Sequence, residues 1–357
     1  MSFPVIDIYI NKIEENAVQM QKMLKEKNID LTAVVKGFAG DLKVFKAFQN
    51  AAVNSIADSR LQNIKKYREA GYQGEIMMLR IPMPSELEEA VKYIDTTLLS
   101  EIKTARAAAE AAVKANKEIK VIIMVDLGDR REGVLAENLQ KLAAEIIKLD
   151  GLKLDGIGTN LGCFAGVLPD ENNTKKLIEL KHDLEEEFSL KLNRISAGNT
   201  ATTILLNNHD LSSKINNLRI GEGILLGTDI INERLFKDLN HYNFRLRAEI
   251  IELQAKPSNP EGEMAFDGKG RNQILKDKGL RKRAIAAVGK QDIDYHGLYP
   301  LDKGIEVLGA SSDHLILDLT DLKKELAVGD IITFKMNYSA MLRAMTSAYV
   351  EKNYLYK

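Results

Sequence analysis

The chain has little of the residues that build disulfides and metal sites. Its 357 residues include one cysteine, five histidines and no tryptophan. Cys163 therefore has no partner for an internal disulfide, which suits a reducing cytoplasm. The histidines show no H-E-x-x-H spacing, and Asp313 beside His314 is insufficient for a metal site. We expect a cytoplasmic protein without a bound metal.

The sequence also lacks an excess of either charge and any long apolar run. It has 50 basic and 51 acidic residues and a net charge of -1, a balance that argues against nucleic acid or another polyanion as a partner. The longest apolar runs, such as residues 121–125, are far too short to cross a bilayer. Residues 1–10 have no basic segment followed by an apolar core. We expect a soluble protein that binds neither nucleic acid nor a membrane.

What the chain does contain is a repeated unit: a short apolar run, a polar cluster and a helix-forming stretch. The apolar runs are residues 31–35, 55–57, 75–79, 96–99, 121–125, 154–157, 194–197 and 217–220. Eight parallel strands close a barrel. The glycine clusters at 156–162 and 221–227 are one residue off the dinucleotide fingerprint of a doubly wound sheet. The sequence therefore predicts an α/β fold with a (β/α)8 TIM-type barrel.

From about Phe244 the pattern changes to strands with turn-formers between them and little helix-forming sequence. The predicted strands are residues 245–253, 283–288, 305–308, 315–319 and 331–335. We predict a barrel domain over residues 1–235 and a smaller, mostly β domain over 236–357. Residues 5–10 alternate like a strand that can be added to this β domain, and residues 256–279 read as a long loop.

Lys36 directly follows the apolar run 31–35, at the carboxyl end of a strand buried on both faces. In a barrel, that end is where ligands bind. One interpretation is a lysine that caps the strand and extends into solvent. The other is a partly desolvated amine whose pKa falls toward useful nucleophilicity.

Polar residues follow every predicted strand and are expected to converge at one mouth. They are Lys36, Asp58, Arg60, Arg80, Ser100, Asp126, Asp129, Arg130, Arg131, Thr159, Asn160, Gly198, Asn199, Thr200, Arg219, Gly221 and Glu222. Loops are polar in any barrel, so the residue types carry the information. Glycines with Asn and Thr after strands seven and eight form the common barrel phosphate site, whose backbone N–H groups cradle the anion. A lysine nucleophile beside a phosphate cradle indicates pyridoxal phosphate.

Four motifs, taken in order, resemble those of the alanine racemase family, which are fold-type III pyridoxal-phosphate enzymes with a barrel followed by a β domain. The motifs are residues 34–37 (VVKG), 125–133 (VDLGDRREG), 196–200 (SAGNT) and 218–223 (LRIGEG). Within the family, residues 124–133, 309–314 (GASSDH) and 346–349 (TSAY) are similar to motifs of the ornithine racemase group.

The resemblance implies a role for each matched residue. Lys36 is the Schiff-base lysine, Arg131 hydrogen-bonds the phenolic oxygen of the cofactor, and Asn160 lies against its ring. Arg219 faces the pyridine nitrogen, and because an arginine keeps its proton, that nitrogen stays unprotonated. The implied phosphate and cofactor contacts are Ser196, Gly198, Asn199, Thr200, Gly221 and Glu222. The resemblance also implies a homodimer whose active sites are shared between subunits.

The sequence departs from the family at the second catalytic acid/base, which is a tyrosine at the start of the β domain. The matching position is Phe266, which cannot transfer a proton. Asp267, Tyr338 or Cys163 takes the role, or another residue does. Tyr338 can instead bind phosphate, and Cys163 can be a small buried apolar residue.

The resemblance implies a racemase for an amino acid, ornithine or another basic one. The distal ammonium of ornithine needs a carboxylate, and the candidates are Asp58, Asp129, Glu132 and Asp313. The alternatives are an alanine or broad-specificity racemase and a non-catalytic pyridoxal-phosphate carrier, although such carriers consist of the barrel alone. A decarboxylase is disfavoured by Arg219, and a metal-dependent aldolase by the absence of a metal cluster.

Overall fold

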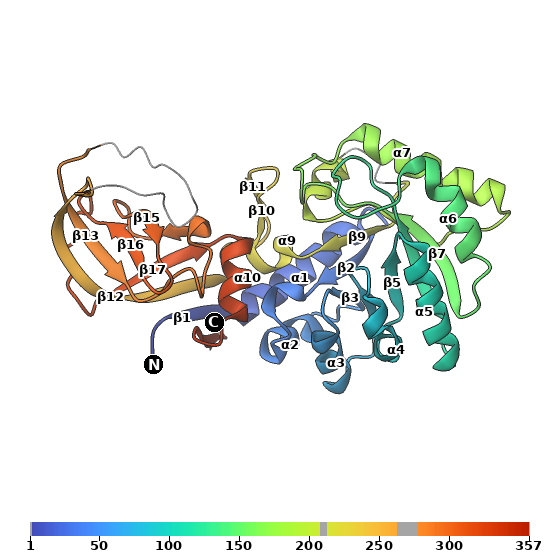
Figure 1. Cartoon of the computed structure of the whole chain (residues 1–357), viewed down its shortest axis with the longest axis horizontal. Coiled ribbons are helices and arrows are strands. Elements are labelled where there is room, and N and C mark those ends of the chain that lie inside the picture. Colours follow the sequence, from blue (N-terminus) through green and yellow to red (C-terminus); the bar gives the residue numbers. More distant parts are fainter. Residues whose placement is uncertain (1, 208–212, 263–276, 357) are drawn as a thin grey trace. The chain divides into compact units, whose positions relative to one another are not determined.

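The computed structural model describes residues 2–207, 213–262 and 277–356 (Figure 1). The chain forms two compact units. One comprises Tyr9–Asn243, and the other combines the N-terminal residues up to Ile8 with Phe244–Leu355. The sequence placed the division at 235/236, whereas residues 236–243 belong to the first unit, where Asn16 holds the backbone of Asn240 through bonds of 2.7 and 2.9 Å.

The first unit is a closed barrel of eight parallel strands, as the sequence predicted. The strands are β2 (Asp30–Val34), β3 (Ser55–Asp58), β4 (Glu75–Met78), β5 (Thr96–Leu99), β6 (Ile119–Met124), β7 (Leu152–Gly158), β8 (Arg194–Ser196) and β9 (Asn217–Ile220). Pairing of β2 with β9 closes the barrel, with Thr32 opposite Arg219. The prediction of a (β/α)8 barrel is confirmed.

Helices follow the strands around the outside of this barrel (Figure 1). The α-helices are α1 (Ile10–Lys25), α2 (Leu42–Asn50), α3 (Leu61–Glu69), α4 (Leu87–Ala90), α5 (Ile102–Lys114), α6 (Leu139–Ile146), α7 (Glu171–Glu187) and α9 (Glu222–Leu226). The 3-10 helices are η1 (Lys36–Phe38), η2 (Pro84–Glu86), η3 (Ala136–Asn138) and η4 (Thr200–Asn207). A short hairpin of β10 (Thr228–Asp229) and β11 (Arg234–Leu235) follows α9.

The barrel interior changes character along its axis. Its middle is apolar, with Val34, Ala57, Met77, Leu98 and Ile122 packed together from successive strands. Burial of this cluster supplies the hydrophobic stabilisation that holds the strands in register. Polar side chains occupy the interior on either side of it, and those at the carboxyl ends of the strands form the site described below.

The second unit is one antiparallel sheet with a helix. Its elements are β1 (Val5–Tyr9), β12 (Phe244–Pro257), β13 (Leu280–Ala286), β14 (Leu298–Pro300), β15 (Glu306–Ala310), β16 (Leu315–Asp318), β17 (Ile331–Met336), β18 (Glu351–Leu355), α10 (Tyr338–Thr346) and the 3-10 turn η5 (Tyr295–Gly297). The order is β14-β17-β12-β13-β16-β15, and β1 pairs with β12 and β18. Along β12, Phe244, Leu246, Ala248 and Ile250 are fully buried, because alternate side chains of a strand face the same side.

Four elements of this unit differ from the sequence expectations: three were missed and one is longer than expected. The helix α10 and the strands β14 and β18 were not predicted, because elements this short are determined by tertiary contacts more than by their own periodicity. The strand β12 also continues to Pro257, into the stretch expected to be a loop, and residues 263–276 of that stretch lie outside the described residues.

Within the described part of the chain, no helix is long and apolar enough to span a membrane.

Candidate active site at the barrel mouth

Lys36 stands at the carboxyl end of β2, where the chain leaves the sheet and enters η1. Val35 still donates to the Ala57 carbonyl at 2.9 Å, so the backbone is held by the barrel up to the lysine. Among the described residues the Lys36 amine has no hydrogen-bond or ion-pair partner. Burial lowers the pKa of Lys36, and Arg131 lowers it further, while Cys163 and Asp58 oppose the shift.

Arg131 is presented by the loop that follows β6. Asp126 accepts a hydrogen bond from the Gly128 backbone at 2.8 Å and so closes the turn. Gly133 allows the loop to fold back, since it has a φ of 129° and a Cβ there would lie 2.4 Å from the Asp126 nitrogen. The Arg131 guanidinium pairs with Glu132 at 2.6 Å. Its charge acts on both Lys36 and Arg219, so the loop delivers a cation to the mouth.

Asn160 and Cys163 lie in the loop after β7. The Asn160 amide donates to the Cys163 sulfur at 2.8 Å. The Asn199 amide, from the loop after β8, donates to the Leu161 carbonyl at 2.7 Å and joins the two loops. The buried Asp129 accepts from backbone N–H groups of Cys163, Phe164 and Val167, the shortest bond being 2.8 Å from Phe164. Cys163 is exposed, unlike the buried apolar role that its residue type suggested.

The loops after β8 and β9 come together as the phosphate-site interpretation requires. Thr200 accepts a bond from the Gly223 backbone at 3.3 Å, which joins the start of η4 to the start of α9. Gly198 has a φ of 127°, and a Cβ there would lie 2.3 Å from the Thr202 hydroxyl. Gly221 immediately precedes α9. Two chain turns that begin with glycine therefore lie next to each other.

The Glu222 side chain is directed elsewhere. Its carboxylate accepts from the Thr228 hydroxyl at 2.6 Å and from the Ile230 backbone at 3.1 Å. Burial raises the pKa of Glu222 to about 7. The sequence placed Glu222 among the phosphate contacts, but only its backbone is available for that role, and its carboxylate fastens the β10–β11 hairpin.

Arg219 projects from β9 into the barrel interior and is 3% exposed. Its guanidinium donates to the Thr159 carbonyl at 2.6 Å and to both the carbonyl and the hydroxyl of Ser196. The Ser196 hydroxyl also bonds Asn217 at 2.5 Å. Burial lowers the pKa of Arg219 to about 10, so it remains protonated at neutral pH. Ser196, interpreted as a cofactor contact, is fully buried and supports Arg219.

A polar chain continues from Asn217 through the barrel, and the sequence did not reveal it. Asn217 donates to Thr32 at 2.9 Å, and Thr32 bonds Ser55 at 3.1 Å. Ser55 donates to Glu75 at 3.1 Å, and Glu75 pairs with Arg194 at 3.0 Å. The sequence feature that could have indicated this polar chain is the pair of charged residues, Glu75 and Arg194, at the starts of otherwise apolar strands.

The acids considered for a cationic substrate are mostly engaged. Asp58 accepts from the Arg60 backbone at 2.9 Å and from Asn63 and Tyr67, and burial raises its pKa to about 6. Asp129 binds three backbone N–H groups, and Glu132 pairs with Arg131, as described above. Asp313 belongs to the second unit.

Two residues proposed for proton transfer are not placed at this mouth by the described geometry. Tyr338 begins α10 in the second unit, where Asn337 caps the helix. Asp267 and the neighbouring Phe266 lie outside the described residues. No three histidine, cysteine, aspartate or glutamate side chains within 2–207, 213–262 and 277–356 gather as a metal site.

A parallel barrel that carries a lysine and a buried arginine at the carboxyl ends of its strands, followed by an antiparallel β unit, defines a class of barrel enzymes. The chain belongs to the alanine racemase family. Residues 8–229 match the family described as "Alanine racemase, N-terminal domain". The family assignment made from the motifs is confirmed.

Two relatives match nearly the whole chain. The lysine racemase of Thermotoga maritima is 41% identical over 354 residues, 99% of each chain. The ornithine racemase of Acetoanaerobium sticklandii is 42% identical over 354 residues, 99% of this chain and 100% of that one. The chain is therefore an amino-acid racemase.

Solved structures share the fold at low sequence identity. An alanine racemase of Clostridium difficile 630 gives a TM-score of 0.74 at 20% identity, over 100% of this chain and 97% of that one. The D-threonine aldolase of Filomicrobium marinum gives 0.74 at 15% identity, over 97% and 89%. These likenesses bear on the fold alone.

Proposed function

We propose that this racemase interconverts the L and D forms of a basic amino acid, ornithine or lysine, with pyridoxal 5'-phosphate on Lys36. The observation that carries the proposal is the Lys36 amine, which lies at the mouth of the barrel without a partner among the described residues. The two relatives that match nearly the whole chain are racemases named for these basic amino acids. Their full-length match also disfavours a carrier that consists of the barrel alone.

The residues around Lys36 fit this cofactor. An amine attacks an aldehyde only when it is unprotonated, and burial lowers the pKa of Lys36. Gly198 leaves room where a side chain would overlap Thr202. The Thr200–Gly223 bond brings the loops after β8 and β9 together, so that backbone N–H groups from both can surround one phosphate. Asn199, Gly221 and the backbone of Glu222 complete the proposed phosphate site.

When bound, the cofactor withdraws electrons from the amino acid and makes its α-hydrogen acidic. The Lys36 amine removes this proton from one face of Cα and returns it there in the opposite direction. Arg131 and Arg219 are proposed to orient the ring, with Asn160 against it. Arg219 keeps its own proton at neutral pH, so it does not protonate the ring nitrogen, which moderates the electron withdrawal and disfavours loss of the substrate carboxylate.

Inversion needs a second group that exchanges a proton on the opposite face of Cα. Cys163, Asp267 and Tyr338 are the candidates. Each is tested by the variants Cys163→Ala, Asp267→Asn and Tyr338→Phe in deuterated solvent. Loss of the true second group stops inversion, while Lys36 still exchanges the α-hydrogen of one enantiomer. If a variant keeps both inversion and exchange of the α-hydrogen, the replaced residue is not the second proton-transfer group.

The proposed function is tested by a chiral assay of the purified protein against ornithine, lysine, alanine and serine, followed by borohydride reduction and peptide mapping. A charge-assisted contact contributes roughly 1.5–3 kcal/mol. We therefore expect kcat/KM for ornithine or lysine to exceed that for alanine by about tenfold or more. The reduced cofactor is expected on Lys36, and Lys36→Ala should abolish turnover. Equal turnover of alanine, or a modified lysine elsewhere, would contradict the proposal.

We further propose a cytoplasmic homodimer. The single free cysteine supports the location, and the resemblance to the family supports the dimer. Mixing Lys36→Ala subunits with subunits that lack the second proton-transfer group tests whether active sites are shared. Recovery of activity in the mixture is expected if each site draws on both subunits. Light scattering that gives a monomer mass would contradict the dimer.

A further inference from the structure

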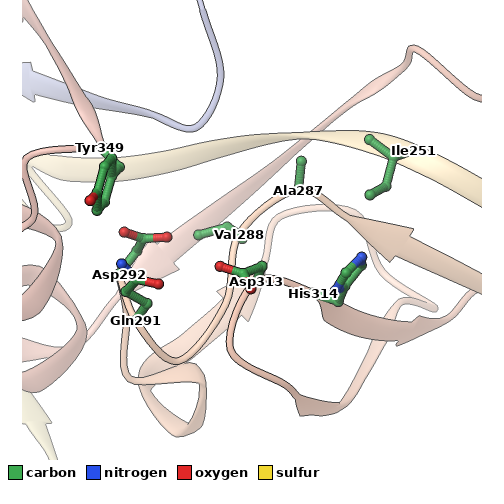
Figure 2. Close-up of a pocket in the computed structure, with 8 residues that line it drawn as sticks. All are labelled: Ile251, Ala287, Val288, Gln291, Asp292, Asp313, His314 and Tyr349. Atoms are coloured by element: carbon green, nitrogen blue, oxygen red, sulfur yellow. The ribbon is translucent and has the colours of Figure 1, made fainter.

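The β unit contains a pocket of about 500 Å³ that the proposed chemistry at the barrel mouth does not use. Its volume lies within the range of small-molecule sites. In Figure 2, Asp292 and Tyr349 lie toward one end and Ile251 and Ala287 toward the other, while Asp313 lies between Asp292 and His314. All of these residues belong to the same compact unit.

Two segments that resemble motifs of the ornithine racemase group meet in this pocket. Residues 311–314 form the turn between β15 and β16, closed by a 2.9 Å bond from the Ser311 nitrogen to the His314 carbonyl. The turn after β13 lies against it, and a Cβ on Gly289 would lie 2.0 Å from the Ser312 carbonyl oxygen. Only glycine permits this approach, which brings Asp292 and Asp313 into one cavity. Tyr349, from the segment of residues 346–349, supplies the third wall.

Asp292 is the more buried of the two carboxylates that line the pocket. The residue is 8% exposed, and its Oδ1 accepts from the Ser347 hydroxyl at 2.7 Å. Its Oδ2 has no partner among the described residues. Oδ2 is not fully enclosed by the protein, so a cationic ligand that enters the pocket can form a charge-assisted hydrogen bond with it.

Asp313 adds a second carboxylate, which has no hydrogen-bond or ion-pair partner in the described part of the chain. No lysine or arginine lines the pocket, and nearby Lys352 is directed to the Ser347 carbonyl. The two carboxylates are therefore not paired with a lysine or arginine of the pocket lining, which also includes His314.

The remaining walls suit an alkyl chain that ends in a cation. Ile251, 45% exposed, offers apolar surface for methylene groups, and the buried Val288 lines the pocket beside Ala287. Tyr349 is 68% exposed and supplies an aromatic face for a cation–π contact.

We propose that this pocket binds a primary alkylammonium group, with Asp292 and Asp313 as its carboxylate partners. The inference rests on the proposed function, because ornithine and lysine carry such a group. At the barrel mouth, Asp58, Asp129 and Glu132 are already engaged. Of the four acids considered for the substrate ammonium, Asp313 is the one without a hydrogen-bond or ion-pair partner among the described residues.

The test combines kinetics with equilibrium binding. Racemisation of ornithine is compared with that of norvaline, which lacks the ammonium, for wild type, Asp313→Asn, Asp292→Asn and the control Glu325→Gln. Asp313 and Glu325 are both exposed, so their substitutions are safe for folding and change the charge equally. Asp292→Asn keeps an oxygen for Ser347. Titration calorimetry with n-butylamine, on borohydride-reduced wild type and variants whose cofactor can no longer condense with an amine, measures binding without turnover.

We expect Asp313→Asn and Asp292→Asn each to weaken n-butylamine binding by about tenfold, and Glu325→Gln to leave it unchanged. If the bound group is the side chain of the substrate, kcat/KM for ornithine falls by a similar factor and that for norvaline does not. If it belongs to a separate amine ligand, ornithine kinetics are unchanged while n-butylamine binding is lost. Unchanged binding and unchanged kinetics would overturn the proposed pocket. A wild-type protein that racemises neither ornithine nor lysine would instead overturn the proposed function.

Discussion

Arg219 and Ser196 are joined inside the barrel by two hydrogen bonds, in which the guanidinium donates to the carbonyl oxygen of Ser196 at 3.2 Å and also to its hydroxyl. Neither side chain has appreciable contact with solvent. A buried guanidinium is tolerated only when its N–H groups are bonded. Ser196 therefore determines where Arg219 points, and Arg219 is the cation proposed to face the cofactor ring.

Replacement of Ser196 by alanine should destabilise the protein and slow racemisation. The substitution leaves a guanidinium N–H and the Asn217 amide oxygen without their shared partner, at a cost of about 1–3 kcal/mol in the free energy of unfolding. Urea denaturation measures this loss. Ser85→Ala is the matched control, since Ser85 is exposed. Equal stability of the two variants would show that the Ser196 hydroxyl does not support Arg219.

Lys36 should titrate below surface lysines. Burial lowers its pKa, whereas Glu88 raises the pKa of exposed Lys114. Competitive acylation of the cofactor-free protein, followed by mass spectrometry across a pH series, gives a reactivity midpoint for each lysine. We expect the Lys36 midpoint at lower pH than the Lys114 midpoint, because only the unprotonated amine reacts. The same midpoint for both would contradict the lowered pKa.

Cofactor binding should protect Cys163 from alkylation. The thiol is exposed, is contacted by the Asn160 amide, and acts electrostatically on Lys36. A ring bound at Lys36 with Asn160 against it is expected to cover the sulfur. The rate of iodoacetamide modification, followed by mass spectrometry with and without pyridoxal phosphate, should fall by about tenfold on binding. Equal rates in both states would place the ring away from the Asn160 side of the mouth.

The sequence was sufficient for the barrel because each strand is a short apolar run that must be buried on both faces. It was also sufficient to bring Lys36, Arg131 and Arg219 to one mouth, since the carboxyl ends of parallel strands share one end of a barrel. What it could not provide was side-chain direction. Nothing in the pattern distinguishes a glutamate facing phosphate from Glu222, which faces Thr228.

The strands of the β unit were located less completely for a related reason. Helix α10 is nine residues long, and β14 is three. Elements of this length are determined by tertiary contacts, which periodicity does not record. The pocket of Asp292 and Asp313 depends in the same way on Gly289 approaching a turn more than twenty residues away along the chain. The motif at residues 309–314 is recognisable in the sequence, whereas nothing in the sequence indicates that the turn of Gly289 and Asp292 contacts it.

Glu222 should make the stability of the barrel unit depend on pH in the direction opposite to that of most carboxylates. Burial raises its pKa from 4.5 to about 7. The folded protein therefore binds the proton more tightly than the unfolded chain, so stability is highest below about pH 4.5 for this group and falls as pH rises to about 7. Above that range the charged carboxylate remains buried at a cost on the order of 1–3 kcal/mol.

Glu222→Gln removes this cost while its amide oxygen can still accept from Thr228 and Ile230. We expect the variant to match wild type near pH 5 and to be more stable at about pH 8, by on the order of 1–3 kcal/mol in urea denaturation. Glu325→Gln is the control, because Glu325 is exposed and shows no resolved shift, and its difference from wild type should not change with pH. If Glu222→Gln is less stable than wild type at both pH values, the carboxylate stabilises the β10–β11 hairpin through its charge, and the burial cost inferred for it is wrong.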